Sequence, residues 1–342
     1  MNVANASTLI VDHVNVTVHN GAANFYAYGT DSIIHVNNSW LYSSGPVSHG
    51  LYAADGGVIH ANNLVHYSGG NRASSFSGDS GGGDIYVTDA VAHTTGIGSA
   101  IAFVVGSISL TNVVGLAENS PIQFMDSAQT ASYTNCDLTG GLLGGLFMFS
   151  SSTKSSSPAN ITVTDSKITV TGDTVPALWA GNTYAIVELY NTVIATDSGI
   201  LAVSNYSQTT QEFDFYAGYV DNNDLSPATL KVTVEESTLV GDLVAYNGST
   251  ISWGISSYTS WTGAAYAGDD NNAVKFSVSL DSTSNWTLTK DTTLQSFTDT
   301  TTNLTNIFSN GYSISYNSSS TANAWLDGKT ISLSGGGYAK PL

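Results

Sequence analysis

Two neighbouring segments decide the fold: SIIHVNNSWLYSSG (residues 32–45) and GVIHANNLVHYSGG (57–70) carry the same pattern. Each alternates apolar and polar residues up to an asparagine and then begins a second short alternation. The pattern continues in GDIYVTDAVAHTTG (83–96), GSISLTNVVGLAEN (106–119), TASYTNCDLTGG (130–141), NITVTDSKITVTG (160–172), AIVELYNTVIATDSG (185–199) and LKVTVEESTLVGD (230–242). Alternation with period two and many β-branched residues predicts β-strands rather than helices.

One Asn or Asp position aligns these segments and sets their period. It falls at Asn38, Asn63, Asp89, Asn112, Asn135, Asp165, Asn191 and, loosely, Glu236. We call these eight residues the anchors. Most neighbouring anchors are separated by roughly 23 to 30 residues, which is too short for repeats made of helix pairs. A second short apolar strand recurs between anchors, for example NFYAYGT (24–30), GLYAADG (50–56) and GLFMFSS (145–151). Two or three short strands in each repeat predict one coil of a parallel β-helix.

Stacking the coils assigns each strand position to a column. The position four before the anchor holds Ile34, Ile59, Ile85, Ile108, Ala131, Ile161, Val187 and Val232, which we expect to face the core. The next position holds His35, His60, Tyr86, Ser109, Ser132, Thr162, Glu188 and Thr233, which we expect to face water. Stacked anchors are expected to hydrogen-bond along the axis as an asparagine ladder.

The predicted fold is therefore all-β: a single-stranded right-handed parallel β-helix of roughly ten to eleven coils. It forms one domain over residues 1–342. An excursion at 206–228 explains the long spacing before Glu236, and a segment at about 301–342 is expected to cap the open end, since an exposed solenoid edge invites pairing.

The pattern resembles the secreted right-handed parallel β-helix proteins of bacteria and fungi, in the superfamily of pectate lyases and phage tailspikes. Within it, the chain is most similar to a subgroup without settled function. Phrases such as ITVTDSKITVTG (161–172) and SNWTLTKDTTLQSF (284–297) carry the likeness. These are motifs of the fold, so the resemblance implies an architecture and no catalytic residue.

Composition excludes several classes of function. The chain has 342 residues and a formal net charge of −18, with 26 Asp and Glu against 8 Lys and Arg. Arg72 is its single arginine, which argues against a nucleic-acid surface and against a lyase base acting on an acidic polymer. No apolar run is long enough to predict a membrane-spanning helix. We expect a neutral polysaccharide or cell-surface glycan as partner, and no nucleic acid.

The excursion is the first candidate site, because function concentrates in long loops that interrupt a repeat. The expected catalytic residues are Glu212, Asp214, Asp221 and Asp224. Glycoside hydrolysis needs two carboxyl groups about 5–10 Å apart across the scissile bond. The alternative is a solvated acidic loop. No cofactor is expected, although such acids could hold Ca²⁺.

Aromatic residues give a second candidate. Trp253, Tyr258, Trp261 and Tyr266 lie close together and are expected to bind substrate by stacking on sugar faces. The alternative is that strand alternation turns half of these rings into the core. His35 and His60 should lie about 5 Å apart in their column, which is close enough to share a transition-metal ion. A plain polar ladder is the alternative, and no metal site is predicted.

Export is expected from the neutral polar composition. Asn-x-Ser/Thr glycosylation motifs occur at Asn5, Asn15, Asn37, Asn160, Asn205, Asn247, Asn285, Asn303 and Asn317. Cys136 is the only cysteine, so no intrachain disulfide can form. The opening MNVANASTLIV lacks the pattern of a signal peptide, so either a leader was removed or the protein is not exported.

Three functions remain open from the sequence. The first is a secreted β-helix that binds or processes a polysaccharide. The second is a strict glycoside hydrolase with paired acids. The third is a non-catalytic surface protein of the tailspike or adhesin kind, either monomeric or trimeric. For a tailspike-like trimer we expect an apolar strip along the side of the rod.

Overall fold

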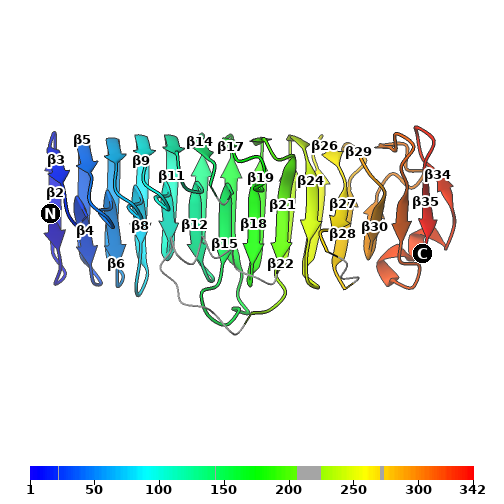
Figure 1. Ribbon diagram of the computed structural model, residues 1–342, viewed down its shortest axis with the longest axis horizontal. Helices are drawn as coiled ribbons and strands as arrows, with labels where there is room; N and C mark the ends of the chain where they lie inside the picture. The colour runs from blue at the N-terminus through cyan, green and yellow to red at the C-terminus, as the bar shows by residue number, and fades with distance from the viewer. Residues whose placement is uncertain (22, 143, 206–224, 270–272) are drawn as a thin grey trace.

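The computed structural model is an elongated rod of stacked β-coils with the two termini at opposite ends (Figure 1). It describes all residues except 22, 143, 206–224 and 270–272. The chain forms an all-β parallel solenoid of about 13 turns. The predicted class is confirmed, but the expected ten to eleven coils fall short. After Glu236, the corresponding corner position is Ser257, which has positive φ but is neither Asn nor Asp, so the Asn/Asp period ends before the C-terminal coils.

Two long parallel sheets run along the rod within the described residues. Sheet 1 contains β1 (Asn2–Val3), β4 (Phe25–Tyr28), β6 (Leu51–Ala54), β8 (Phe76–Gly78), β10 (Ala102–Val104), β12 (Gln123–Asp126), β15 (Leu146–Phe149), β18 (Leu178–Gly181), β21 (Ile200–Asn205), β24 (Asp242–Ala245) and β27 (Ala265–Ala267). Sheet 2 contains β2 (Thr8–Asp12), β5 (Ile33–Ser43), β7 (Val58–Ser68), β9 (Gly83–Thr94), β11 (Gly106–Ala117), β13 (Thr130–Thr134), β16 (Ala159–Thr164), β19 (Tyr184–Tyr190), β22 (Thr229–Glu235), β25 (Thr250–Ser256), β28 (Lys275–Leu280) and β31 (Ser296–Asp299).

Shorter strands complete the coils. Sheet 2 also includes β3 (Asn15–Val18), β14 (Asp137–Gly140), β17 (Lys167–Val170) and β20 (Val193–Thr196). A third sheet holds β23 (Thr238–Val240), β26 (Ser260–Gly263), β29 (Asn285–Leu288) and β32 (Ile307–Phe308). A fourth, at the C-terminal end, holds β30 (Thr292–Leu294), β33 (Ile314–Tyr316), β34 (Ile331–Ser332) and β35 (Tyr338–Pro341), next to the 3₁₀-helix η1 (Thr321–Leu326).

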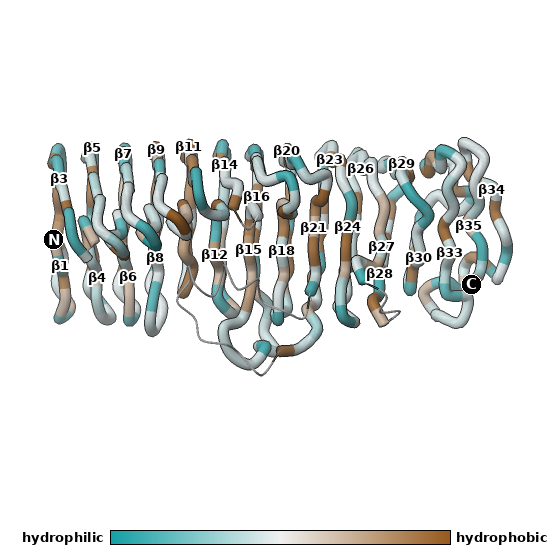
Figure 2. The backbone as a smooth tube through the Cα atoms, in the orientation of Figure 1, coloured by the Kyte–Doolittle hydropathy of each residue, from teal (hydrophilic) through white to brown (hydrophobic). Residues whose placement is uncertain are grey.

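Strand register confirms the predicted columns. Ile34 pairs with Ile59, which pairs with Ile85 and then Ile108, and all four side chains are buried. Sheet 1 contributes to the same core, and Figure 2 shows brown, apolar stretches on it, for example at β21 and β24. Burying each such side chain contributes about 1.5–3 kcal/mol. Stacking like residues therefore supplies one continuous core from Val3 to Ala339.

The anchors turn the chain at the corner within each long strand. All eight have positive φ, from 44° at Asn191 to 57° at Asp89. Asn and Asp tolerate this left-handed conformation better than other residues with a side chain. The period of Asn and Asp in the sequence is therefore the period of this turn.

The anchors also form the expected ladder. The Nδ2 group of Asn63 donates to Asn38 Oδ1 at 2.7 Å, and Asn38 Nδ2 donates to Asp12 Oδ1 at 2.8 Å. Two further runs begin at Asp89, which accepts from Asn112, and at Asp165, which accepts from Asn191. A carboxylate accepts but cannot donate, so each Asp starts a run that the following Asn residues extend.

The C-terminal coils are held by large aromatic residues. Trp261 and Trp286 stack in register with ring centroids 4.7 Å apart, and their indole N–H groups donate to Gly241 and Gly263 carbonyls. The end of the rod differs from the coils, because η1 contacts β31 and β34 pairs antiparallel with β35. Trp325 of η1 packs on Phe297 and donates to its carbonyl oxygen at 2.8 Å.

Candidate functional site

Tyrosines occupy adjacent outward positions on the first strands of sheet 1. Tyr26 in β4 pairs with Tyr52 in β6. The residues on either side of Tyr26, Phe25 and Ala27, are fully buried, as are Leu51 and Ala53 beside Tyr52. Because side chains alternate across a strand, these buried neighbours hold both tyrosines on the outer face.

An open hollow lies over these tyrosines. It encloses about 530 Å³ and its lining includes Asn2, Gly21, Tyr26, Val47, His49 and Tyr52. We call it the tyrosine hollow. No lysine or arginine is among its lining residues. The lining also includes Met1, whose N-terminal ammonium donates to the Asn24 carbonyl oxygen at 2.6 Å. The hollow therefore offers apolar and aromatic surface beside this terminal cation.

Ring orientation distinguishes the hollow from the aromatic ladders elsewhere. The Tyr26 and Tyr52 rings meet edge to face, with centroids 4.8 Å apart and planes at 76°. In an edge-to-face pair, one ring points its edge at the face of the other. Neither face of that edge-on ring is covered by its partner. In contrast, Tyr42 and Tyr67 on sheet 2 are parallel within 3°, so each covers a face of the other. Two further rings approach this pair: His49 lies 5.2 Å from Tyr52 with planes at 32°, and Tyr28 lies 5.8 Å from Tyr26 with planes at 67°. Sugar rings stack on aromatic faces, and both recorded ring contacts of Tyr26 are edge to face, unlike the parallel contacts of the ladders.

Tyr52 is tied to a carboxylate. Its hydroxyl donates to Asp79 Oδ2 at 2.5 Å, and Asp79 Oδ1 accepts from the backbone N–H of Ser80 at 2.7 Å. Burial, reinforced by the bond to Asp79, raises the pKa of Tyr52 well above its usual range. The phenol therefore stays protonated, and its oxygen keeps a lone pair for a ligand hydroxyl.

His49 supplies a donor at the same place. Its Nδ1 accepts a hydrogen bond from the backbone N–H of Ser74 at 3.1 Å, and burial lowers its pKa to about 4. The ring is therefore neutral at pH 7. Since Nδ1 acts as the acceptor, the proton resides on Nε2, which is an N–H donor. Aromatic surface, a donor and a hydroxyl acceptor together suit a polyhydroxylated ligand.

The substrate-binding residues expected at 253–266 do not form a platform. Trp253 and Trp261 are each only 1% exposed and pack ring against ring in the core, so the expectation of surface stacking is wrong for them. Strand alternation explains this placement, because Trp253 continues the inward column below Val232. Tyr258 is exposed at the turn between β25 and β26, whereas Tyr266 lies half-buried on β27.

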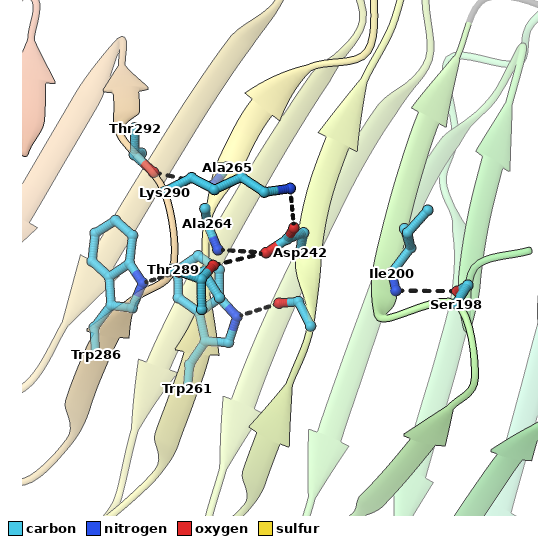
Figure 3. A network of polar contacts seen from close by, with 12 residues as sticks. Ser198, Ile200, Asp242, Trp261, Ala264, Ala265, Trp286, Thr289, Lys290 and Thr292 are labelled. Atoms are coloured by element: carbon cyan, nitrogen blue, oxygen red, sulfur yellow. Dashed lines mark hydrogen bonds and ion pairs between the residues drawn. The ribbon is translucent and has the colours of Figure 1, made fainter. Parts of the chain in front are cut away.

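Tyr266 lies beside a polar cluster in which Asp242, Ala264, Thr289 and Lys290 join several coils (Figure 3). Lys290 Nζ lies 4.1 Å from the centroid of the Tyr266 ring and 2.8 Å from Asp242 Oδ2. The other oxygen of Asp242 accepts from the Ala264 N–H and from the Thr289 hydroxyl. The hydrogen bond that Lys290 donates to Asp242 raises the pKa of Lys290. Because the charges are matched within the protein, this cluster stabilises the rod rather than serving a ligand.

The four expected catalytic acids, Glu212, Asp214, Asp221 and Asp224, lie outside the described residues. Among the described glutamates, Glu118 pairs with His93 at 2.7 Å, and Glu188 points outward from β19 at an exposed position. The described part of the chain contains no group of three or more His, Cys, Asp or Glu residues placed to hold a metal ion.

The sequence contains a signal for the tyrosine hollow that our reading missed. NFYAYGT and GLYAADG both place a tyrosine at the third position of the recurring short strand. Aligning that strand coil by coil predicts stacked outward tyrosines. His49 and Asp79, which neighbour Tyr52 in the hollow, lie outside the strands, and only the folded coils bring them to the tyrosines.

Comparisons of the chain with protein-family models, with curated proteins and with solved structures found no match in any of the three. Among the described residues, no helix has the length and apolar character needed to span a membrane.

Proposed function

We propose that this chain is an exported β-helix protein that binds a neutral polysaccharide at the tyrosine hollow. The observation that carries the proposal is the perpendicular pair of Tyr26 and Tyr52 beside the Asp79 carboxylate and the neutral His49. Ring faces bind the apolar face of a sugar, and the polar groups match its hydroxyls. The net charge of −18 disfavours acidic polymers.

The rest of the chain agrees with this proposal. The resemblance to the pectate-lyase and tailspike superfamily adds a fold in which long outer faces meet extended ligands, although fold alone does not fix function. None of the nine glycosylation motif asparagines is buried, although the amide nitrogens of Asn247 and Asn317 donate hydrogen bonds to other side chains. Treating protein secreted from a eukaryotic host with an N-glycosidase and weighing it would show which are used.

A glycan array tests the binding site. Wild-type protein should bind one class of neutral glycan, and Tyr26→Ala should abolish that signal. Tyr52→Phe should weaken it, because it removes the hydroxyl held by Asp79 but keeps the ring. Tyr67→Ala is the matched control, since Tyr67 stands in a parallel ladder on the other sheet. Equal binding by all four proteins would refute the site.

A reducing-sugar assay separates binding from hydrolysis. The proposal expects no release of reducing ends from polysaccharides that the protein binds. Release that Glu212→Gln or Asp214→Asn abolishes would instead establish a glycoside hydrolase with acids from the excursion. Silence in both the array and the assay would exclude both carbohydrate functions.

One observation favours a second function, lateral association of copies of this chain. Trp40, Val65, Val91 and Val114 form one outward column in register across β5, β7, β9 and β11. Trp40 is 63% exposed, Val91 49% and Val114 56%. Contiguous exposed apolar surface on a soluble protein marks an interaction site. Analytical ultracentrifugation should then show an oligomer that Val91→Glu dissociates, whereas a monomeric wild type would exclude this function.

A further inference from the structure

Two histidines on sheet 2 face each other at a distance set by the fold. His35 in β5 pairs directly with His60 in β7, and their ring centroids are 5.1 Å apart with planes at 10°. Both rings lie on the outer face, His35 half-buried and His60 exposed. The inward neighbours Ile34 and Ile59 are fully buried, so the backbones beneath the two rings are held firmly.

These two rings differ from the other histidines in their partners. The remaining five each contact a polar group: His13 contacts Asp12, His19 contacts Ser44, His49 contacts Ser74, His66 contacts Ser43 and Ser75, and His93 contacts Glu118. For His35 and His60 the structure records only ring stacking, with each other and, on the far side of His60, with Tyr86 at 5.0 Å. Within the described residues, therefore, no polar group is recorded against the ring nitrogens of His35 or His60.

The chemistry of the pair suits a metal ion. Metal binding needs neutral imidazole, in which a ring nitrogen has a lone pair available for the ion. One ion bound at about 2 Å to each ring requires the two nitrogens to lie about 3–4 Å apart. Strands in one sheet are about 4.8 Å apart, and the lone pair of a ring nitrogen lies in the ring plane. Both side chains must therefore rotate out of their stack for the two nitrogens to converge on one ion.

We propose that His35 and His60 together bind one divalent transition-metal ion of the Cu²⁺ and Zn²⁺ class. Imidazole suits both ions, and Cu²⁺ is expected to bind more tightly. No third His, Cys, Asp or Glu of the described chain completes the set, so water or an external ligand takes the remaining positions. This site lies on sheet 2 and is independent of the tyrosine hollow on sheet 1.

Titration with Cu²⁺ tests the pair. Chelator-treated full-length protein should bind one equivalent, and its electron paramagnetic resonance spectrum should show two imidazole nitrogens. His35→Ala and His60→Ala should each weaken binding by about tenfold or more, because each removes one of two linked ligands. Both positions are on the surface, and circular dichroism would verify that the variants fold.

Two control variants complete the experiment. His19→Ala and His13→Ala remove exposed histidines outside the pair and should leave the affinity unchanged. Glycan binding by His60→Ala should also be unchanged, which separates this site from the proposed function. Equal Cu²⁺ affinity in wild type and the His35→Ala/His60→Ala double variant would overturn the proposal, as would a spectrum with a single nitrogen ligand.

Discussion

Acid should destabilise the N-terminal coils through two buried histidines. His66 is 1% exposed and His49 is 9% exposed. Burial lowers the pKa of His66 to about 3 and that of His49 to about 4. In the unfolded chain, histidine has a pKa of about 6.5. The unfolded state therefore binds protons more tightly, so stability is complete above pH 6.5 and falls as the pH drops toward 4 and then 3.

The size of the effect follows from these values. Each pKa unit corresponds to about 1.4 kcal/mol. At pH 5, an unfolded histidine gains about 2 kcal/mol from protonation, while a ring with a pKa of 4 or below gains almost nothing. The free energy of unfolding should therefore fall by about 4 kcal/mol between pH 7.5 and pH 5 because of these two rings. Asp79 opposes the shift of His49, and Arg72 reinforces it.

Hydrogen exchange measured by mass spectrometry checks this locally, because coils of a solenoid can open separately. After correction for intrinsic exchange rates, the opening free energy of amides in β6 and β8 should fall by about 4 kcal/mol from pH 7.5 to pH 5. In His66→Gln, which removes one titrating ring and keeps hydrogen-bonding groups, the fall should be about half as large. His19→Gln is the exposed control and should behave as wild type. Identical pH dependence in His66→Gln and wild type would refute the reasoning.

Three further changes test other parts of the rod. Burial raises the pKa of Asp299 to about 6, so the charged carboxylate destabilises the fold increasingly as the pH rises from about 4 to 6. Asp299→Asn removes this charge and should therefore raise the melting temperature at pH 8 but not at pH 3.5. Asn112→Asp replaces the donor to Asp89 with a second carboxylate and should cost about 1–3 kcal/mol at pH 7, with a smaller loss at pH 3, as urea unfolding would show. Trp286→Ala removes the stack on Trp261 and should cost about 3–5 kcal/mol, so a loss below about 1 kcal/mol in the same assay would contradict the core role of that ring.

The repeat could be interpreted from sequence because a solenoid makes its contacts between equivalent positions of adjacent coils. Register followed from aligning Asn38 with Asn63, and it placed Ile34 on Ile59 and His35 on His60 as the structure has them. The orientation of the aromatic side chains at 253–266 was harder to predict. There, alternation required a choice between two faces, and the sequence alone did not show that Trp253 continues an inward column.

The sequence by itself determined the fold class, the coil period, the asparagine ladder and the distance between His35 and His60. All of these depend on the one-dimensional period of the chain and on strand spacing. Only the tertiary structure decided the tyrosine hollow. Tyr26 and Tyr52 come from strands, His49 and Asp79 come from turns of different coils, and the angle between the tyrosine rings depends on packing. Unlike the anchors, the turns that carry His49 and Asp79 do not repeat the same residues from coil to coil, so no period in the sequence predicts that these two lie together.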